Sequence, residues 1–394
     1  MNARSHDRPL FTVNFFLLFA LVYLSYFSTD FLVPVLPLYT VELGGSEFCV
    51  GLLAGLFYTC SIIFRPLLGK KAGQTGLRPL LIFGSGLYCI AGLGLIFFPT
   101  LPSLYLFRSA QGIGWGSFLL AFNTLAINIA PPTRKGESVG ILGIAFMGSL
   151  ATAPWLAEFL QPYLVDYRLF FGLTVLTSLA SLLLSLAFTE PPTDKADLPE
   201  INRLMFSKKA ILPSMAILFL SLPFGATLTF LPLMGLERSF ASVGPFFTIF
   251  SLAAMITRPL AGVLSDRWGR LVIFLPGLAI QFFSTLLIAR AMAPALLLLG
   301  GFLFSTGISL AYTSLMALTS DLIPPQERTA GIATFTIAYD LGLTSGSILS
   351  GLVLLRLNFT GLYYLFAITS LLPLALLPAL KKAIGQKPPP PVTF

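Results

Sequence analysis

Long apolar runs separated by short polar stretches dominate the sequence. A membrane-spanning helix needs about 20 apolar residues in succession, and the runs are continuous rather than alternating, which argues against a membrane β-barrel. We therefore predict an all-α membrane protein whose twelve spanning helices lie at 10–38, 45–68, 79–98, 103–130, 138–161, 168–188, 210–236, 241–264, 271–291, 294–321, 329–356 and 359–380.

A weak internal repeat divides these runs into two sets of six. The segment Arg65-Pro-Leu-Leu-Gly69 returns 193 positions later as Arg258-Pro-Leu-Ala-Gly262, and the same offset carries residues 131–132 onto 324–325. Two matches at one offset indicate an internal duplication. A polar, proline-containing stretch separates the two copies of the repeat. We therefore predict four parts of the chain: an N-terminal six-helix bundle at 1–189, a linker at 190–209, a C-terminal six-helix bundle at 210–381 and a tail at 382–394.

The distribution of positive charge predicts the orientation. When the N-terminus is placed in the cytoplasm, all but five of the 24 Lys and Arg fall in or beside the two tails, every second loop and the linker; the exceptions are Arg108, Arg168, Arg238, Arg290 and Arg356. Cytoplasmic loops of membrane proteins are enriched in Lys and Arg. We therefore expect both termini in the cytoplasm and a multi-pass protein of the cell inner (plasma) membrane.

Composition narrows the function classes further. The chain is 56% hydrophobic and 10% charged, whereas soluble domains carry about 25% charged residues. The net charge of +8 is explained by topology and does not indicate nucleic-acid binding. The sequence has no phosphate-binding Gly-rich loop, and its single His6 excludes a histidine-based metal site or catalytic triad. We expect a monomer that is not an enzyme, with no metal and no cofactor.

Three motifs carry a family resemblance. Residues 258–270 match the pattern G-x-L-a-D-R-x-G-R, Arg108-Ser-Ala-Gln111-Gly112-Ile-Gly114 matches R-x-x-q-G-x-g, and 149–158 is a degenerate form of g-x-x-x-G-P-x-x-G-G. They resemble the loop, fourth-helix and fifth-helix patterns of the major facilitator superfamily, in particular its twelve-helix drug/proton antiporter-type exporters. The resemblance implies two pseudo-symmetric six-helix bundles, alternating access and a proton gradient as the energy source.

The duplicated loop motif is the predicted gating motif. The resemblance implies that Asp266 binds a helix N-terminus and holds the two halves in the outward-facing state; Gly73 replaces this Asp in the N-terminal copy. We therefore expect an asymmetric gate, although the arginines alone could simply set the topology. The predicted gating residues are Arg65, Gly69, Gly73, Gly76, Arg78, Arg258, Gly262, Asp266, Arg267, Gly269 and Arg270.

Four charged residues inside the predicted helices are candidates for proton or substrate coupling: Asp30, Arg108, Glu158 and Asp340. Intramembrane charges are costly and mark functional sites by default. Asp30 and Arg108 lie about 12 Å and about 8 Å from the predicted outer ends of their helices, so we expect them to form an ion pair or to exchange one for a proton or substrate.

Each of these four residues also has a structural interpretation. Asp30 and Arg108 could form a static pair that joins two helices, Glu158 could lie in water at the interface, and Asp340 could bond a neighbouring helix. The repeat argues for function, because the offset places uncharged residues opposite all four; these are Pro223, Gly301, Gly351 and Met147.

Polar and aromatic residues on the predicted helices are candidates for the substrate cavity. Each one alone is also typical of a bond between helices or of the membrane interface. The predicted cavity residues are Asn14, Tyr23, Tyr26, Tyr58, Gln111, Asn123, Trp155, Thr227, Gln281, Tyr312 and Tyr339.

The sequence therefore predicts a secondary transporter that works by alternating access. Three intramembrane carboxylates against one Arg favour protons or cations over anions, which indicates proton-coupled efflux of a small amphipathic or cationic organic compound. The expected partners are this small-molecule substrate, protons and the lipid bilayer. Alternatives are proton-coupled uptake of a small metabolite such as a sugar, and a lipid transporter or a non-transporting receptor of the same fold.

Overall fold

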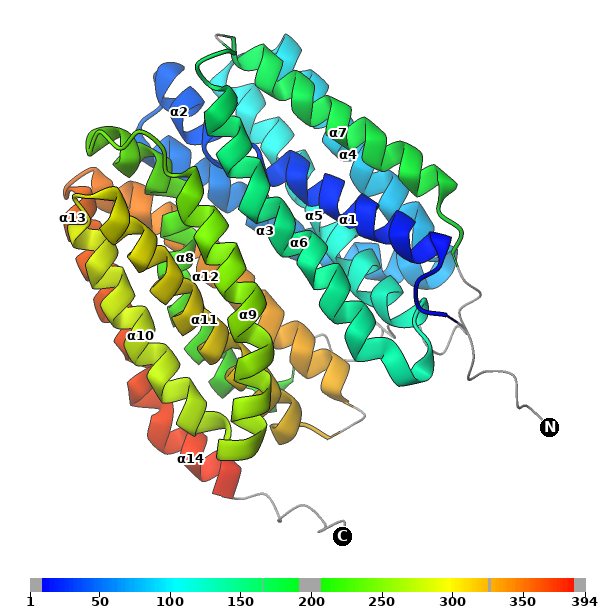
Figure 1. The fold of residues 1–394 in the computed structure, drawn as a ribbon, viewed down its shortest axis with the longest axis vertical. Coiled ribbons are helices and arrows are strands. Elements are labelled where there is room, and N and C mark those ends of the chain that lie inside the picture. Colours follow the sequence, from blue (N-terminus) through cyan, green and yellow to red (C-terminus); the bar gives the residue numbers. More distant parts are fainter. Residues whose placement is uncertain (1–8, 165, 191–206, 325–326, 386–394) are drawn as a thin grey trace. The chain divides into compact units, whose positions relative to one another are not determined.

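The computed structural model describes residues 9–164, 166–190, 207–324 and 327–385, and these form helices joined by short connections (Figure 1). The helices are α1 (Val13–Asp30), α2 (Val35–Glu42), α3 (Glu47–Thr75), α4 (Arg78–Phe97), α5 (Leu101–Asn128), α6 (Lys135–Leu160), α7 (Tyr167–Ala187), α8 (Ile211–Glu237), α9 (Gly244–Trp268), α10 (Arg270–Arg290), α11 (Pro294–Leu322), α12 (Arg328–Leu354), α13 (Phe359–Leu371) and α14 (Leu377–Gly385).

The predicted all-α architecture is confirmed. Within the described residues, 11 helical segments are long and apolar enough to cross a membrane, with α1 and α2 taken together, and likewise α13 and α14. The remaining long helix, α5, spans 28 residues. It carries Arg108, Gln111 and Asn123, which lower its hydropathy and explain why it is not among the 11.

The first predicted helix, 10–38, is broken directly after Asp30. In a continuous α-helix the N–H of residue 34 would donate to the Asp30 carbonyl oxygen, but Pro34 has no N–H. The Val33 N–H donates to that oxygen instead, at 3.1 Å, and α1 ends at Asp30. The last predicted helix, 359–380, is likewise interrupted by a 3₁₀ turn over Leu372–Leu376 that contains a proline.

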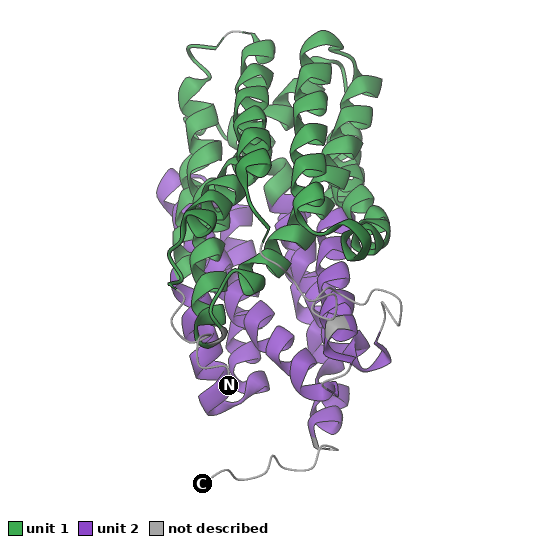
Figure 2. Ribbon diagram, turned by 90° about the vertical axis from the view of Figure 1, so that its right-hand side faces the viewer, with its two compact units in different colours: residues 1–203, 228–255, 347–356 green, residues 204–227, 256–346, 357–394 purple. Residues whose placement is uncertain are grey.

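The structure contains two compact units (Figure 2). Unit 1 consists of residues 1–203, 228–255 and 347–356, and unit 2 of residues 204–227, 256–346 and 357–394. Most of the predicted linker at 190–209 lies outside the described residues, so the predicted bundle boundaries stay a prediction.

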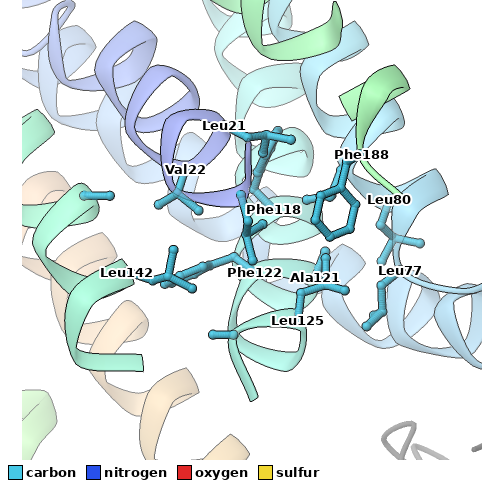
Figure 3. Packing of buried hydrophobic residues seen from close by; sticks show 14 of the residues in the cluster. Leu21, Val22, Leu77, Leu80, Phe118, Ala121, Phe122, Leu125, Leu142 and Phe188 are labelled. Atoms are coloured by element: carbon cyan, nitrogen blue, oxygen red, sulfur yellow. The ribbon is translucent and has the colours of Figure 1, made fainter. Parts of the chain in front are cut away.

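The core of unit 1 is built from α1–α7. Helix α1 packs against α6 and α7, while α3 and α4 pack against α5. Figure 3 shows Leu21 and Val22 of α1 beside Phe118 and Phe122 of α5, with Leu142 of α6 at the same cluster. In lipid there is no water to drive apolar surfaces together, so this close packing itself supplies much of the cohesion.

Unit 2 contains close contacts between glycine and backbone. Helix α10 packs against α11 and α13. Gly342 and Gly346 of α12 approach α8 so closely that a Cβ on either glycine would strike backbone atoms of Leu218 or Leu222. The face of α12 that carries Gly342 and Gly346 is therefore a packing surface, as small residues in membrane helices commonly are.

Candidate functional site

Asp30 is held by a neighbouring helix. Its position at the end of α1 leaves the side chain only 8% exposed. The Ser149 hydroxyl of α6 donates a hydrogen bond to its carboxylate, and Ser149 is itself fully buried. The partner of this intramembrane carboxylate is thus a neutral side chain. The small residue at 149 both permits close packing of α1 and α6 and supplies the bond.

Arg108 lies on α5 and is surrounded by aromatic and amide groups. Its Nη1 donates to the Gln111 side-chain oxygen at 2.9 Å, and its guanidinium carbon is 4.2 Å from the centroid of the Phe57 ring on α3. A guanidinium over a ring face is attracted by the ring quadrupole. Its Nε is buried and has no hydrogen-bond partner in the described part of the chain.

The structure does not form the predicted ion pair between Asp30 and Arg108. Among the described residues, no Arg108 nitrogen lies within 4.0 Å of an Asp30 oxygen, although the two interact electrostatically at longer range. The physical reason is local: the break after Asp30 places its carboxylate against Ser149, while Gln111 and Phe57 hold the guanidinium.

A small cavity of about 50 Å³ adjoins Arg108. The segment that breaks α1 from α2 contributes Leu32 and Val33 to its wall, α3 contributes Tyr58, and α8 contributes Thr229. The structure therefore brings two predicted residues, Arg108 and Tyr58, to one cavity, and the predicted Gln111 is hydrogen-bonded to Arg108.

Several other predicted cavity residues of unit 1 have structural roles. Asn14 donates to the Thr189 carbonyl oxygen at 3.0 Å and ties α1 to the end of α7. Asn123 donates to a carbonyl of its own helix. Trp155 is 47% exposed and stacks on Phe159.

Two tyrosines of α1 differ in environment. Tyr26 is packed in the core, where its ring meets Trp115 and Phe146 edge-on at 4.5 and 4.6 Å. Tyr23 is hydrogen-bonded through its hydroxyl to Thr152 of α6 at 2.8 Å. Helix α6 thus holds α1 at two points, through Thr152 and Ser149.

Unit 2 carries the remaining candidates. Tyr312 of α11 and Tyr339 of α12 meet edge-on with ring centroids 5.2 Å apart, and the Arg258 guanidinium lies 5.7 Å from the Tyr312 ring. Asp340 follows Tyr339 and is 7% exposed. Thr227 donates to a carbonyl of its own helix, and Gln281 is completely buried. The structure thus groups Arg258, Tyr312 and Tyr339.

Glu158, near the end of α6, caps the start of α9. Its carboxylate accepts hydrogen bonds from the Ser242 hydroxyl and from the backbone N–H groups of Val243 at 3.3 Å and Gly244 at 2.7 Å. The first N–H groups of a helix have no partner inside the helix, and its dipole favours a negative charge there. Glu158 is therefore a helix cap within unit 1.

A second cavity, of about 310 Å³, lies at the ends of α2, α6 and α7. Glu42 and Glu158 both line it, together with Tyr167. Glu158 is bonded to the start of α9, and Glu42 interacts electrostatically with the Tyr167 hydroxyl. Both carboxylates thus already have protein partners.

The predicted gating motif of unit 2 contains a bridge of three charges. Arg270, the first residue of α10, pairs with Asp266 near the end of α9 and, through Nε, with Asp321 of α11 at 2.8 Å. The Asp266 side chain is 66% exposed. This arrangement ties α9, α10 and α11 together, while Arg267 beside it is exposed.

The N-terminal copy uses a different carboxylate at the equivalent turn. Glu190, which follows α7, accepts hydrogen bonds from the N–H groups of Leu77 at 2.8 Å and Arg78 at 2.8 Å. The Arg78 side chain in turn donates to the carbonyls of Ser185 and Leu186 at the end of α7. An acid therefore caps the start of α4 and a base caps the end of α7, as the helix dipoles favour.

The glycines of the two copies mark the same turn. Gly76 has a φ of 87° and Gly269 a φ of 99°. Residues other than glycine rarely adopt this backbone conformation. Gly69 and Gly262 lie within α3 and α9, one turn after Arg65 and Arg258. Arg65 donates to the Ser61 hydroxyl at 3.2 Å.

Sequence reasoning did not identify Glu190 or Asp321 as partners of the motif. Glu190 falls in the predicted linker, and Asp321 follows a long apolar run and has no acid opposite it at the repeat offset. One feature of the sequence could have indicated Glu190. It is an acid at the end of an apolar run, and the N-terminal copy of the motif has Gly73 where the C-terminal copy has Asp266.

Comparisons with known proteins agree with this architecture. The family model described as Major Facilitator Superfamily matches residues 18–246 and 214–393. The MFS-type transporter YfkF of Bacillus subtilis (strain 168) is 24% identical over 90% of this chain and 92% of its own length. The staphylopine export protein of Staphylococcus aureus (strain Mu50) is 24% identical over 88% of this chain and 91% of its own length.

Solved structures confirm the twelve-helix fold. A crystal structure of the nucleoside transporter NupG superposes with a TM-score of 0.75 at 16% identity, covering 94% of this chain and 99% of that one. A bacterial homologue of the human lysosomal transporter Spinster gives a TM-score of 0.78 at 11% identity, covering 98% and 100%.

Proposed function

Since the chain belongs to the major facilitator superfamily and is a secondary transporter rather than an enzyme, we propose that it exports a small amphipathic organic compound in exchange for protons. Transport proceeds by alternating access, with the protein acting as a monomer in the cell inner membrane. Both termini lie in the cytoplasm, as the distribution of Lys and Arg favours.

Asp30 carries the proton-coupling part of this proposal. Its buried carboxylate is hydrogen-bonded to a serine hydroxyl rather than to a cation. A hydroxyl can donate to the carboxylate or accept from the carboxylic acid, so Ser149 can accompany Asp30 in both protonation states. An ion pair would instead hold Asp30 in its charged form. Asp340 of α12, also buried, is the second carboxylate that we assign to coupling.

The export direction is supported by two observations. One relative that aligns over most of its length is a staphylopine export protein. Residues 149–158 of α6, a degenerate form of the fifth-helix pattern associated with exporters, include Ser149 and Ala153, and both are fully buried. We also assign the opening and closing of the cytoplasmic side to the predicted gating motif, through the charge bridge around Arg270 and the Glu190 cap.

Directional flux in proteoliposomes tests the proposal. A panel of amphipathic acids, amines and neutral compounds is presented under a pH gradient imposed in either direction. We expect at least one compound to accumulate against its gradient only when protons can move the opposite way. Accumulation together with protons would favour uptake. Purely downhill flux that ignores the pH gradient would remove the antiport mechanism.

A further inference from the structure

Arg108 keeps one edge of its guanidinium free of protein partners. The group has five N–H donors, and its only hydrogen bond within the described chain runs from Nη1 to Gln111. The Nε–H and one Nη2–H point along the opposite edge, which is the edge that forms two parallel bonds with a carboxylate. Nε is buried and without a partner there, and a buried charge with unmet donors is costly unless a ligand meets them.

Three carboxylates of the same unit already interact with protein groups. Asp30 accepts from Ser149, Glu158 caps α9, and Glu42 interacts electrostatically with the Tyr167 hydroxyl. The count of three intramembrane carboxylates against one Arg favoured a cationic substrate. The geometry reverses this inference for unit 1, because here it is the cation that has open donors.

The surroundings of Arg108 resemble a head-group site. The Phe57 ring, 4.2 Å from the guanidinium carbon, covers one face of the group, and Gln111 fixes its far end. The adjoining cavity of about 50 Å³ has Tyr58 and Thr229 in its wall. This volume suits an acid group, whereas pockets for whole drug-sized ligands measure about 300–1,000 Å³.

We propose that Arg108 binds a carboxylate of the transported compound, so that the substrate is an amphipathic organic acid or zwitterion. The acid group would lie against the Nε–Nη2 edge, and the apolar body would extend away from the small cavity. This inference rests on the proposed transport function and names the chemical class of its substrate.

Equilibrium binding to the purified full chain in detergent tests the inference. The probes share one apolar body: 2-naphthoate, 2-naphthamide and 2-naphthylmethylamine. We expect naphthoate to raise the thermal unfolding midpoint, while the amide and the amine do not. Arg108→Lys keeps the charge but cannot form two parallel bonds, so its affinity for naphthoate should be at least about tenfold weaker, as expected for loss of one charged hydrogen bond.

Arg168→Lys is the matched control, because Arg168 is exposed at the start of α7, and it should bind naphthoate as the wild type does. The comparison of acid with amide uses the wild type alone and stands even if Arg108→Lys does not fold. Failure of the wild type to bind naphthoate, equal binding of acid and amide, or full affinity in Arg108→Lys would each overturn the inference.

Different results would contradict the antiport mechanism and the acid-binding site at Arg108. Binding is measured without a gradient, so a protein that binds naphthoate but shows no proton-dependent flux keeps the acid site and loses the antiport mechanism. Proton-driven export of an amine that persists in Arg108→Lys would keep the mechanism and remove the acid site.

Discussion

Individual charged residues in unit 1 are stabilised in three distinct ways. Asp30 is bonded to a neutral hydroxyl, Arg108 is placed over an aromatic ring, and Glu158 is bonded to the N-terminus of a helix. Only Glu158 has a partner that requires it to stay charged, because backbone N–H groups and a helix dipole favour the anion. We therefore assign Glu158 a structural role and keep Asp30 and Arg108 as functional residues.

This assignment predicts the effect of Glu158 substitutions on stability. Glu158→Ala should lower the free energy of unfolding by about 0.5–2 kcal/mol, the range for loss of a helix cap. Glu158→Gln should cost less, since the amide oxygen still accepts from Gly244. Thermal or denaturant unfolding in detergent measures both. Glu137→Ala, which removes an exposed ion pair with Arg134, should have little effect; a loss equal to that of Glu158→Ala would contradict the cap.

The sequence identified these residues more easily than their partners. A charge in an apolar run is visible without a structure, so Asp30, Arg108 and Glu158 could be selected directly. Their partners depend on which helices pack together and in which register. The contact of Asp30 with Ser149 requires α1 to lie against α6, and the break at Pro34 moves the carboxylate out of a continuous helix. Depth along an ideal helix therefore predicted an ion pair that does not form.

At the scale of elements, the duplicated turns keep their backbone and change their charges. Gly76 and Gly269 both adopt a positive φ. The acid that completes the turn is Asp266 in one copy and Glu190, from a different helix end, in the other. The repeat in the sequence could predict the shared turn, because glycine and proline positions survive. It could not predict Glu190, which has no counterpart at the repeat offset.

A matched pair of glycine substitutions tests the turn geometry. Gly76→Ala places a Cβ at a φ of 87° and 2.8 Å from a Glu190 oxygen, so we expect a destabilisation of about 1–2 kcal/mol. Gly73→Ala, three residues earlier within α3, has nothing within 4 Å of the added Cβ and should stabilise the helix by about 0.5–1 kcal/mol. Unfolding curves for the two variants should shift in opposite directions; equal shifts would argue against the turn.

The same motif predicts an asymmetry in transport. Asp266→Asn removes one anion from the bridge with Arg270 and Asp321 and should slow transport, whereas Gly73→Ala changes no charge and should leave the rate near that of the wild type. Flux of one compound through both variants, normalised to protein in the vesicles, measures the difference. Equal loss in both would indicate that Asp266 has no special role.

At the scale of the whole molecule, the alternation of apolar runs and basic loops was sufficient to predict twelve helices. Helix number follows from hydropathy, and similar folds at 11–16% identity show how weakly the architecture depends on particular residues. Orientation is a separate prediction. Reporter fusions at residues 1 and 394 should both report the cytoplasm, and a reporter after residue 99 should report the opposite side. A cytoplasmic signal from all three would contradict the assigned topology.

We propose that protons are exchanged through Asp30, and gradient-driven flux in the Asp30→Asn variant measures this exchange. Asn keeps the size of the side chain and a hydrogen bond with Ser149 but cannot exchange a proton. Asp166→Asn is the matched control, because Asp166 caps α7 from an exposed position and Asn caps equally well. We predict that Asp30→Asn loses accumulation driven by the pH gradient and that Asp166→Asn retains it. Undiminished gradient-driven accumulation in Asp30→Asn would show that Asp30 is not the coupling residue.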